Sequence, residues 1–167
     1  MLKKVALVVF VVVVIIQFIQ PAKNLSDDNT YHISKKYPIP EEVNTILEVA
    51  CNDCHSNKTR YPWYAKLQPS AWFLHNHVTE GKEHLNFSEF TNLSIARQNH
   101  KLEETIEMVE EKEMPLKSYT YFGFHKEANL SDKQRELLIS WAREQMAMLK
   151  ATYPADSLVL KKRKKSS

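Results

Sequence analysis

Glycine occurs at only two positions in this chain of 167 residues, Gly81 and Gly123. Globular proteins average about 7% glycine, because tight hairpin turns, phosphate-binding loops and dinucleotide-binding turns need its positive backbone φ angles. Two glycines cannot supply many such turns. Hairpin-rich β folds and nucleotide-binding α/β folds are therefore excluded, and we expect helices joined by loops.

Apolar side chains recur at helical spacing in three segments, residues 41–54, 94–111 and 130–150. The second segment carries five glutamates on the face opposite its apolar stripe, which is typical of a solvated helix surface. The third begins with Ser131, followed three residues later by Gln134, which is the capping-box pattern of a helix N-terminus. No segment of useful length alternates with the two-residue period of a strand. The predicted fold class is all-α.

The formal net charge of +3 at pH 7 comes from the two ends of the chain. Lys3 and Lys4 have no acidic residue near them, and residues 161–165 are all basic. The remaining residues, 21–160, contain 16 basic and 20 acidic side chains. Because the body of the chain lacks a basic excess that would bind phosphates, nucleic acid is not an expected partner.

An apolar run from Val5 to Ile19, interrupted only by Gln17, follows Lys3 and Lys4. As a helix the run would span about 22 Å, short of the roughly 30 Å hydrocarbon core of a bilayer. The run is typical of an export segment, either a membrane anchor or a cleaved signal peptide, and the lack of a small-residue cleavage site favours the anchor. In both cases the lysines stay on the cytoplasmic side. The rest of a bacterial chain would then lie in the periplasm, outside the inner membrane.

Four regions follow from these patterns. Between the apolar run and the first predicted helix the chain is polar and has no regular period, which is typical of a linker. Prolines interrupt the aromatic-rich segment at residues 58–90, which predicts short helices and loops there. We expect an N-terminal signal-anchor or transmembrane segment (residues 1–20), a linker (21–40), a binding domain (41–150) and a basic C-terminal tail (151–167).

The only two cysteines, Cys51 and Cys54, are followed directly by His55. On a helical turn, residues at positions i, i+3 and i+4 share one face. Two thiols could therefore bond to one edge of a porphyrin while the imidazole points at the iron. This spacing is the pattern of c-type haem attachment.

Three other interpretations of the two cysteines are weaker. A Cys51–Cys54 disulfide would close a very small loop and contribute little stability. A thioredoxin-like redox pair needs a βαβ unit, which the pattern lacks. Zinc needs a second pair of ligands, and the nearest histidines, His75, His77 and His84, form no recognised pattern.

Met114 is the best candidate for a second axial ligand to the iron. It precedes Pro115, just after the charged helix, where the proline would end the helix and stiffen the loop that presents the thioether. A thioether opposite a histidine raises the reduction potential of haem iron. A single methionine can also be core filler, and competing ligands remain at His75, His77, His84, His100 and His125.

The cysteine pattern on a first helix, Met114-Pro115 on a later loop and a closing helix resemble a small class I cytochrome c. A fuller resemblance, over residues 35–150, is to the haem-binding domain family of exported, membrane-anchored bacterial proteins. The residues that carry it are Cys51 to Asn57, Tyr61 to Tyr64, Pro69, Trp72, Leu85 to Ser88, Met114 to Leu116, Tyr119, His125 and Leu130-Ser131. Unlike small cytochromes c, this chain has a long aromatic-rich insertion after His55.

The resemblance implies one covalently attached haem c, with Cys51 and Cys54 as thioether sites, His55 as proximal ligand and Met114 as distal ligand. No second site with paired carboxylates or a nucleophile and base is evident. We therefore expect a membrane-tethered periplasmic electron carrier and not an enzyme, with a redox partner protein at the membrane surface. The alternative is a haem-based sensor or peroxidase-like protein whose sixth ligand is weakly held.

Overall fold

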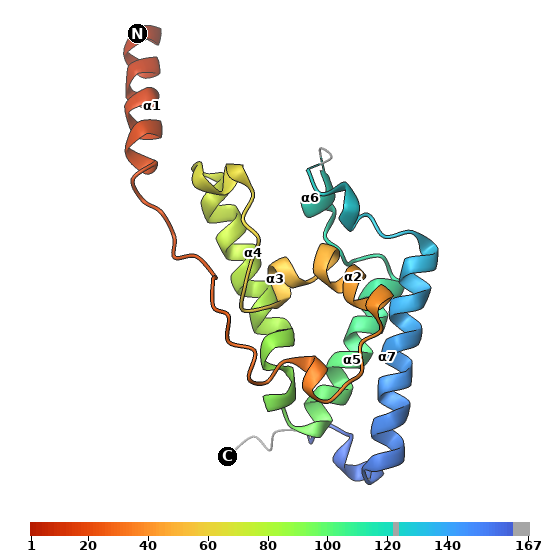
Figure 1. Ribbon diagram of the computed structural model, residues 1–167. Coiled ribbons are helices and arrows are strands. Elements are labelled where there is room, and N and C mark those ends of the chain that lie inside the picture. The colour runs from red at the N-terminus through yellow and green to blue at the C-terminus, as the bar shows by residue number, and fades with distance from the viewer. Residues whose placement is uncertain (122–123, 162–167) are drawn as a thin grey trace.

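The computed structural model describes residues 1–121 and 124–161, and these residues contain helices and no β-strand (Figure 1), so the predicted all-α class is confirmed. The α-helices are α1 (Leu2–Ile16), α2 (Glu41–Ala50), α3 (Asn52–His55), α4 (Ser70–His84), α5 (Ile95–Glu110), α6 (Lys117–Thr120) and α7 (Asp132–Thr152). Short 3-10 turns lie between them: η1 (Ile33–Lys35), η2 (Trp63–Lys66), η3 (Phe87–Asn92), η5 (Lys126–Ala128) and η6 (Ala155–Ser157).

Helices α5 and α7 form an antiparallel pair that carries much of the core (Figure 1). Their apolar stripes meet, with Leu102 and Val109 of α5 and Leu138 and Leu149 of α7 buried in one cluster. Ser94 caps α5, and Ser131 with Gln134 forms the predicted capping box of α7. The two later predicted helices are therefore confirmed within two residues at each end.

The first predicted helix is broken in the structure. Helix α2 ends at Ala50, Cys51 leaves the helical region with φ −126° and ψ −48°, and α3 is a single further turn. The aromatic-rich segment also differs from expectation, because α4 is a full helix of 15 residues. It begins directly after Pro69, and its buried side chains, Ala71, Leu74 and Val78, follow helical spacing.

The segment predicted as a linker, residues 21–40, packs against the domain. Ile33 and Tyr37 have no exposed surface and belong to the main core cluster. The Tyr37 hydroxyl donates a hydrogen bond to Oε1 of Gln98 over 2.6 Å. Two isolated apolar residues in a polar, irregular segment leave no periodic pattern, which is why the sequence indicates a linker here.

Near the C-terminus, α7 extends to Thr152 and Leu158 is buried in the core cluster. The chain is therefore still packed against the domain within the region expected to be a tail. Except for Lys161, the basic run of that predicted tail lies outside the described residues.

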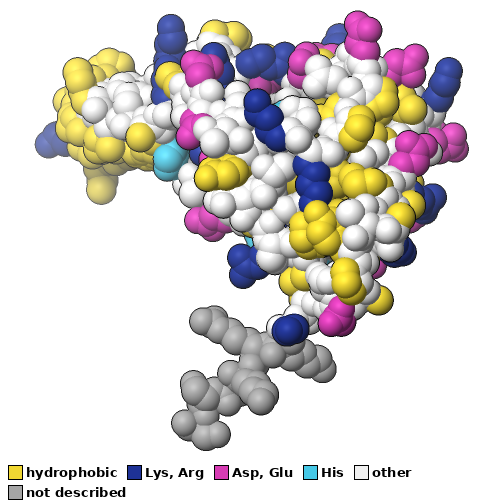
Figure 2. Space-filling model, turned by 60° about the horizontal axis from the view of Figure 1, so that its bottom comes forward, with side chains coloured by type: hydrophobic (Ala, Val, Ile, Leu, Met, Phe, Trp, Pro, Cys, Tyr) yellow, Lys and Arg dark blue, Asp and Glu magenta, His cyan; other side chains and the backbone are white. Residues whose placement is uncertain are grey.

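Helix α1 has no buried residue and projects from the domain (Figures 1 and 2). The residues that follow it are tied to the start of α4. Gln17 Oε1 accepts the Gln68 backbone N–H over 2.9 Å, and Trp72 Nε1 donates to the Ile19 carbonyl over 3.1 Å. In the described part of the chain no helix combines the length and apolarity needed to cross a membrane, so the predicted transmembrane helix is not supported.

Candidate functional site

Cys51, Cys54 and His55 lie on one tight turn, which we call the cysteine turn (residues 51–55). The Cys51 carbonyl accepts the backbone N–H groups of Cys54 over 3.1 Å and of His55 over 2.9 Å. Both cysteines are free thiols. Burial raises the pKa of Cys51 to about 12 and that of Cys54 to about 11, so both thiols are protonated at neutral pH. The structure thus brings together the three residues of the predicted attachment pattern.

The His55 ring is oriented by two backbone carbonyls at the end of α4. Its Nδ1 lies 2.9 Å from the Gly81 oxygen and 3.0 Å from the Leu85 oxygen. Because a carbonyl only accepts, Nδ1 carries the proton and the lone pair is on Nε2. Burial lowers the pKa of His55, which also favours the neutral ring. No hydrogen-bond partner of Nε2 lies within residues 1–121 or 124–161, so this atom is available as a metal ligand.

Gly81 allows α4 to approach the cysteine turn closely. A Cβ atom at this position would lie 2.7 Å from the Cys54 carbonyl oxygen and 3.0 Å from Cys54 Cβ. The first distance is shorter than real Cβ atoms show, and the second is a tight contact. One of the two glycines in the chain therefore lies where α4, whose end supplies the carbonyls that contact His55, packs against the cysteine turn.

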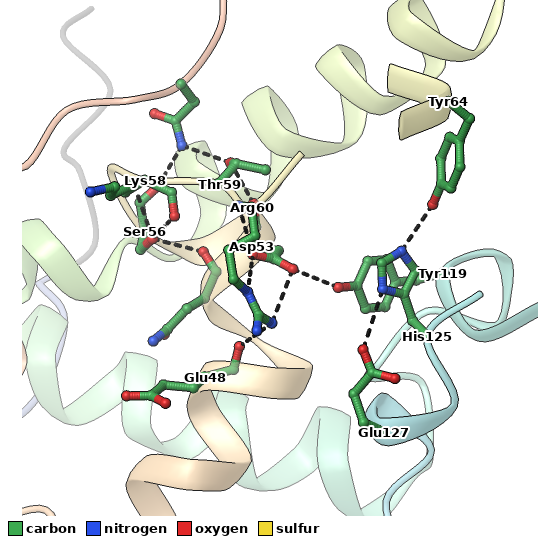
Figure 3. Close-up of polar contacts among 12 residues, drawn as sticks. Glu48, Asp53, Ser56, Lys58, Thr59, Arg60, Tyr64, Tyr119, His125 and Glu127 are labelled. Atoms are coloured by element: carbon green, nitrogen blue, oxygen red, sulfur yellow. Dashed lines mark hydrogen bonds and ion pairs between the residues drawn. The ribbon is translucent and has the colours of Figure 1, made fainter. Parts of the chain in front are cut away.

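Asp53, in the middle of the cysteine turn, is a buried carboxylate with four donors (Figure 3). Oδ1 accepts the Arg60 backbone N–H over 2.9 Å and Nε over 3.2 Å. Oδ2 accepts Arg60 Nη2 over 3.3 Å and the Tyr119 hydroxyl over 2.7 Å. Arg60 Nη2 also donates to the Glu48 carbonyl over 2.7 Å. The four hydrogen bonds compensate for burying the carboxylate, and they hold the backbone of the cysteine turn in place.

Met114 lies in the connection between α5 and α6. Its backbone N–H donates to the Met108 carbonyl over 3.0 Å, and its carbonyl accepts Arg135 Nη1 of α7 over 2.8 Å. The same Arg135 nitrogen donates to the Val109 carbonyl over 3.0 Å. Helix α5 ends at Glu110, before the proline predicted to end it. The backbone of Met114 is thus fixed at a defined place, and its role as a ligand stays a prediction.

The competing histidines make different contacts, and within the described residues only His100 and His125 have partners on both ring nitrogens. His75 and His77 each place Nδ1 within hydrogen-bond distance of a backbone carbonyl, His100 pairs with two glutamates, and His84 is exposed. Both ring nitrogens of His125 have partners, Tyr64 and Glu127. Within the described residues, no three His, Cys, Asp or Glu side chains cluster as a metal site would require, which leaves the zinc interpretation without support.

The donor set of the cysteine turn fits a haem. It offers two adjacent thiols and a neutral imidazole whose free nitrogen is fixed in direction by hydrogen bonds on the other. Sequence reasoning identified these residues but missed the ones that hold them, Gly81, Asp53 and Arg60, and it also missed Arg135, which holds Met114. A glycine inside a helix of a glycine-poor chain is the one available signal, because it indicates close packing.

The family model described as the haem-binding domain matches residues 11–144 of the chain. The matched range contains the cysteine turn, Gly81, the Met114 connection and Arg135. No curated protein and no solved structure matches the chain. The class I cytochrome c-like fold therefore stays a prediction.

Proposed function

The chain belongs to the haem-binding domain family, and on that premise we propose that it carries one haem c, bound through thioether bonds from Cys51 and Cys54. His55 is the proximal iron ligand. The observation that carries this proposal is the orientation of His55, whose Nδ1–H is shared by the carbonyls of Gly81 and Leu85. A histidine held in this way presents Nε2 as a ligand without further rearrangement.

The residues around the turn support this function in separate ways. The two carbonyls fix the tautomer and the direction of the imidazole and raise its basicity as a ligand. Asp53 and Arg60 fix the backbone that spaces the two thiols. The group itself supplies one-electron iron chemistry when bound.

Met114 would complete the proposed ligand set. Its connection is tied at Met108 and Arg135, so the thioether is presented from a fixed backbone. A histidine and a methionine leave no open position for a small substrate, which favours electron transfer over catalysis. We therefore propose an electron carrier that exchanges electrons with a partner protein.

An absorption spectrum tests the cofactor and its attachment. The full chain is produced in a bacterial periplasm together with haem attachment machinery, and the spectrum is taken before and after denaturation. We expect the chromophore to stay on the chain, and the Cys51→Ala, Cys54→Ala double variant to lose it. A wild-type chain that releases its chromophore on denaturation contradicts covalent attachment.

The ligand set is tested by carbon monoxide and by substitution. The reduced protein should resist carbon monoxide, and Met114→Leu should bind it readily and lose the thioether-to-iron band of the oxidised form. Met148→Leu, at a half-buried core methionine, is the matched control. Rapid carbon monoxide binding by the wild type would instead favour the sensor or peroxidase-like alternative.

We further propose that the domain is exported and works at a lipid surface. Helix α1 exposes an apolar surface on all sides, and its end is hydrogen-bonded to the segment that starts α4. Trp63 and Phe73, which are 68% and 55% exposed, flank that segment. Aromatic side chains are typical of membrane interfaces. Cell fractionation and flotation with anionic vesicles test this, and a chain without residues 1–20 should stay unbound.

A further inference from the structure

We propose that the hydrogen bond between Tyr119 and Asp53 is a latch that holds the Met114 segment (residues 111–120) against the cysteine turn. Asp53 and Tyr119 are then positioning residues for the second axial ligand. The inference rests on the proposed function, since it assigns Met114 as that ligand. Asp53 and Tyr119 are themselves neither the proposed thioether sites nor the proposed iron ligands.

The Asp53 end of the latch is rigid. Asp53 is only 7% exposed, and its carboxylate receives three hydrogen bonds from Arg60 in addition to the one from the Tyr119 hydroxyl. The Thr59 hydroxyl also donates to the Asp53 carbonyl over 2.7 Å. An ionised acceptor makes a hydrogen bond about twice as strong as a neutral one. The Asp53 carboxylate is thus held in place by contacts that do not involve Tyr119.

The Tyr119 end has aromatic support (Figure 3). Its ring stacks on the His125 ring with centroids 4.1 Å apart and planes 10° apart. His125 Nε2 lies 2.9 Å from the Tyr64 hydroxyl of η2, and Nδ1 lies 3.6 Å from a Glu127 carboxylate oxygen. The ring of Tyr119 is therefore oriented by groups from η2 and η5. Its hydroxyl can point at Asp53 with little loss of rotational freedom.

The Met114 segment depends on this contact. No side chain of helix α6 is fully buried, and the contacts of Tyr119 with Asp53 and His125 tie the helix to the body of the domain. One end of the segment is fixed by Arg135 on the Met114 carbonyl, and the other end by Tyr119 on Asp53. The acceptor of that second contact lies inside the cysteine turn. The latch therefore links the two halves of the proposed ligand set directly.

Tyr119→Phe removes the hydroxyl and keeps the stacked ring. In the haem-loaded full chain we expect carbon monoxide to bind the reduced protein about tenfold faster, because loss of a hydrogen bond to a charged group frees the Met114 segment. Amide hydrogen exchange of residues 112–120 should accelerate by a similar factor. Tyr31→Phe is the control, since its hydroxyl has no partner within the described residues and the change should leave both rates within twofold.

Tyr64→Phe gives a second, milder test, because it removes only the hydroxyl that orients His125. We expect an intermediate acceleration. The latch is overturned if both variants exchange and bind carbon monoxide within twofold of the wild type while retaining haem. Rapid carbon monoxide binding by the wild type contradicts Met114 ligation instead, and the latch is then decided by the exchange of residues 112–120 alone.

Failure of the proposed function gives a different result. A wild-type chain without covalent haem contradicts that function, whereas the exchange of residues 112–120 still measures whether Tyr119 fixes the segment. If Tyr119→Phe does not fold, as judged by its helical circular dichroism, Tyr64→Phe decides the latch with the same two rates.

Discussion

The cysteine turn and the Met114 segment are held in contrasting ways. The turn combines a buried carboxylate with four donors, two carbonyls on His55 and a glycine contact that permits no added atom. The Met114 segment has mostly exposed or half-buried side chains and is tied by hydrogen bonds at a few points. Helix packing and a buried charge hold the cysteine turn, whereas single polar contacts hold the Met114 segment.

This difference suggests a division of roles between the two regions. A rigid turn suits covalent attachment and the proximal ligand, whose direction must not vary. A segment held by a few polar contacts can be tuned by single substitutions. Changes at the turn should therefore affect folding and haem retention together, whereas changes at the Met114 segment should affect ligation with the fold intact.

Gly81→Ala should give the largest effect. Alanine normally gains about 1 kcal/mol over glycine inside a helix. Here its Cβ would lie 2.7 Å from the Cys54 carbonyl oxygen, and overpacking of this kind costs about 1–3 kcal/mol or more. We expect net destabilisation in urea unfolding, with lower haem retention. Thr79→Ala, at an exposed site on the same helix, is the control and should change stability little.

Arg135→Leu should act on the Met114 segment alone. It removes a cationic donor shared by the Val109 and Met114 carbonyls, which is worth about 1–2 kcal/mol. We expect a loss of stability that overlaps the one for Gly81→Ala, but with faster carbon monoxide binding and unchanged haem retention. Arg143→Leu, at an exposed arginine of α7, should be nearly neutral. Equal loss of haem in the Arg135 and Gly81 variants would remove the proposed division between the regions.

The pH dependence of the haem-free chain tests the cysteine turn separately. Burial lowers the folded-state pKa of His55, so the unfolded chain binds more protons below the unfolded pKa of about 6.5. Stability from this group is complete above that pH and is lost as the pH falls toward the lowered pKa. The urea midpoint should therefore drop between pH 7 and pH 5, and less so in His55→Gln. Iron bound to His55 should flatten this part of the profile, since a ligated nitrogen cannot take the proton.

The elements with a strong period were predictable from sequence, and the contacts between them were not. The apolar stripes of α5 and α7 and the capping box at Ser131 predict these two helices directly. Ile33 and Tyr37 lie fully buried in an aperiodic segment, where no local pattern marks them. The three residues of the cysteine turn were found because their spacing is set by the cofactor's geometry.

The residues that support the site come from distant parts of the chain. Arg135 lies 21 positions from Met114, and Tyr119 lies 66 positions from Asp53. Such pairs depend on how the helices pack, and neither residue type is unusual at its own position. A single sequence shows which side chains can donate or accept hydrogen bonds, but not which of them pair in the fold. The supporting contacts therefore had to come from the structure.

The smallest expected effect lies where the Met114 segment begins. Lys112 has a φ of 60°, and the backbone N–H groups of Lys112 and Glu113 bond to the carbonyls of Val109 and Met108. This is a Schellman helix end with lysine at the position that glycine usually occupies. Lys112→Gly relieves about 1 kcal/mol of left-handed strain and loses an exposed surface pair with Asp132 that contributes little.

The net change should be a stabilisation of less than about 1 kcal/mol in urea unfolding. Lys112→Ala loses the same surface pair but keeps the strain, so the difference between the two variants isolates the backbone conformation. If glycine and alanine give equal stabilities, the left-handed residue contributes no strain. The position of the Met114 segment would then depend only on its polar contacts at Arg135 and Tyr119. Its contrast with the cysteine turn, which is held by packing and a buried charge, would be sharper.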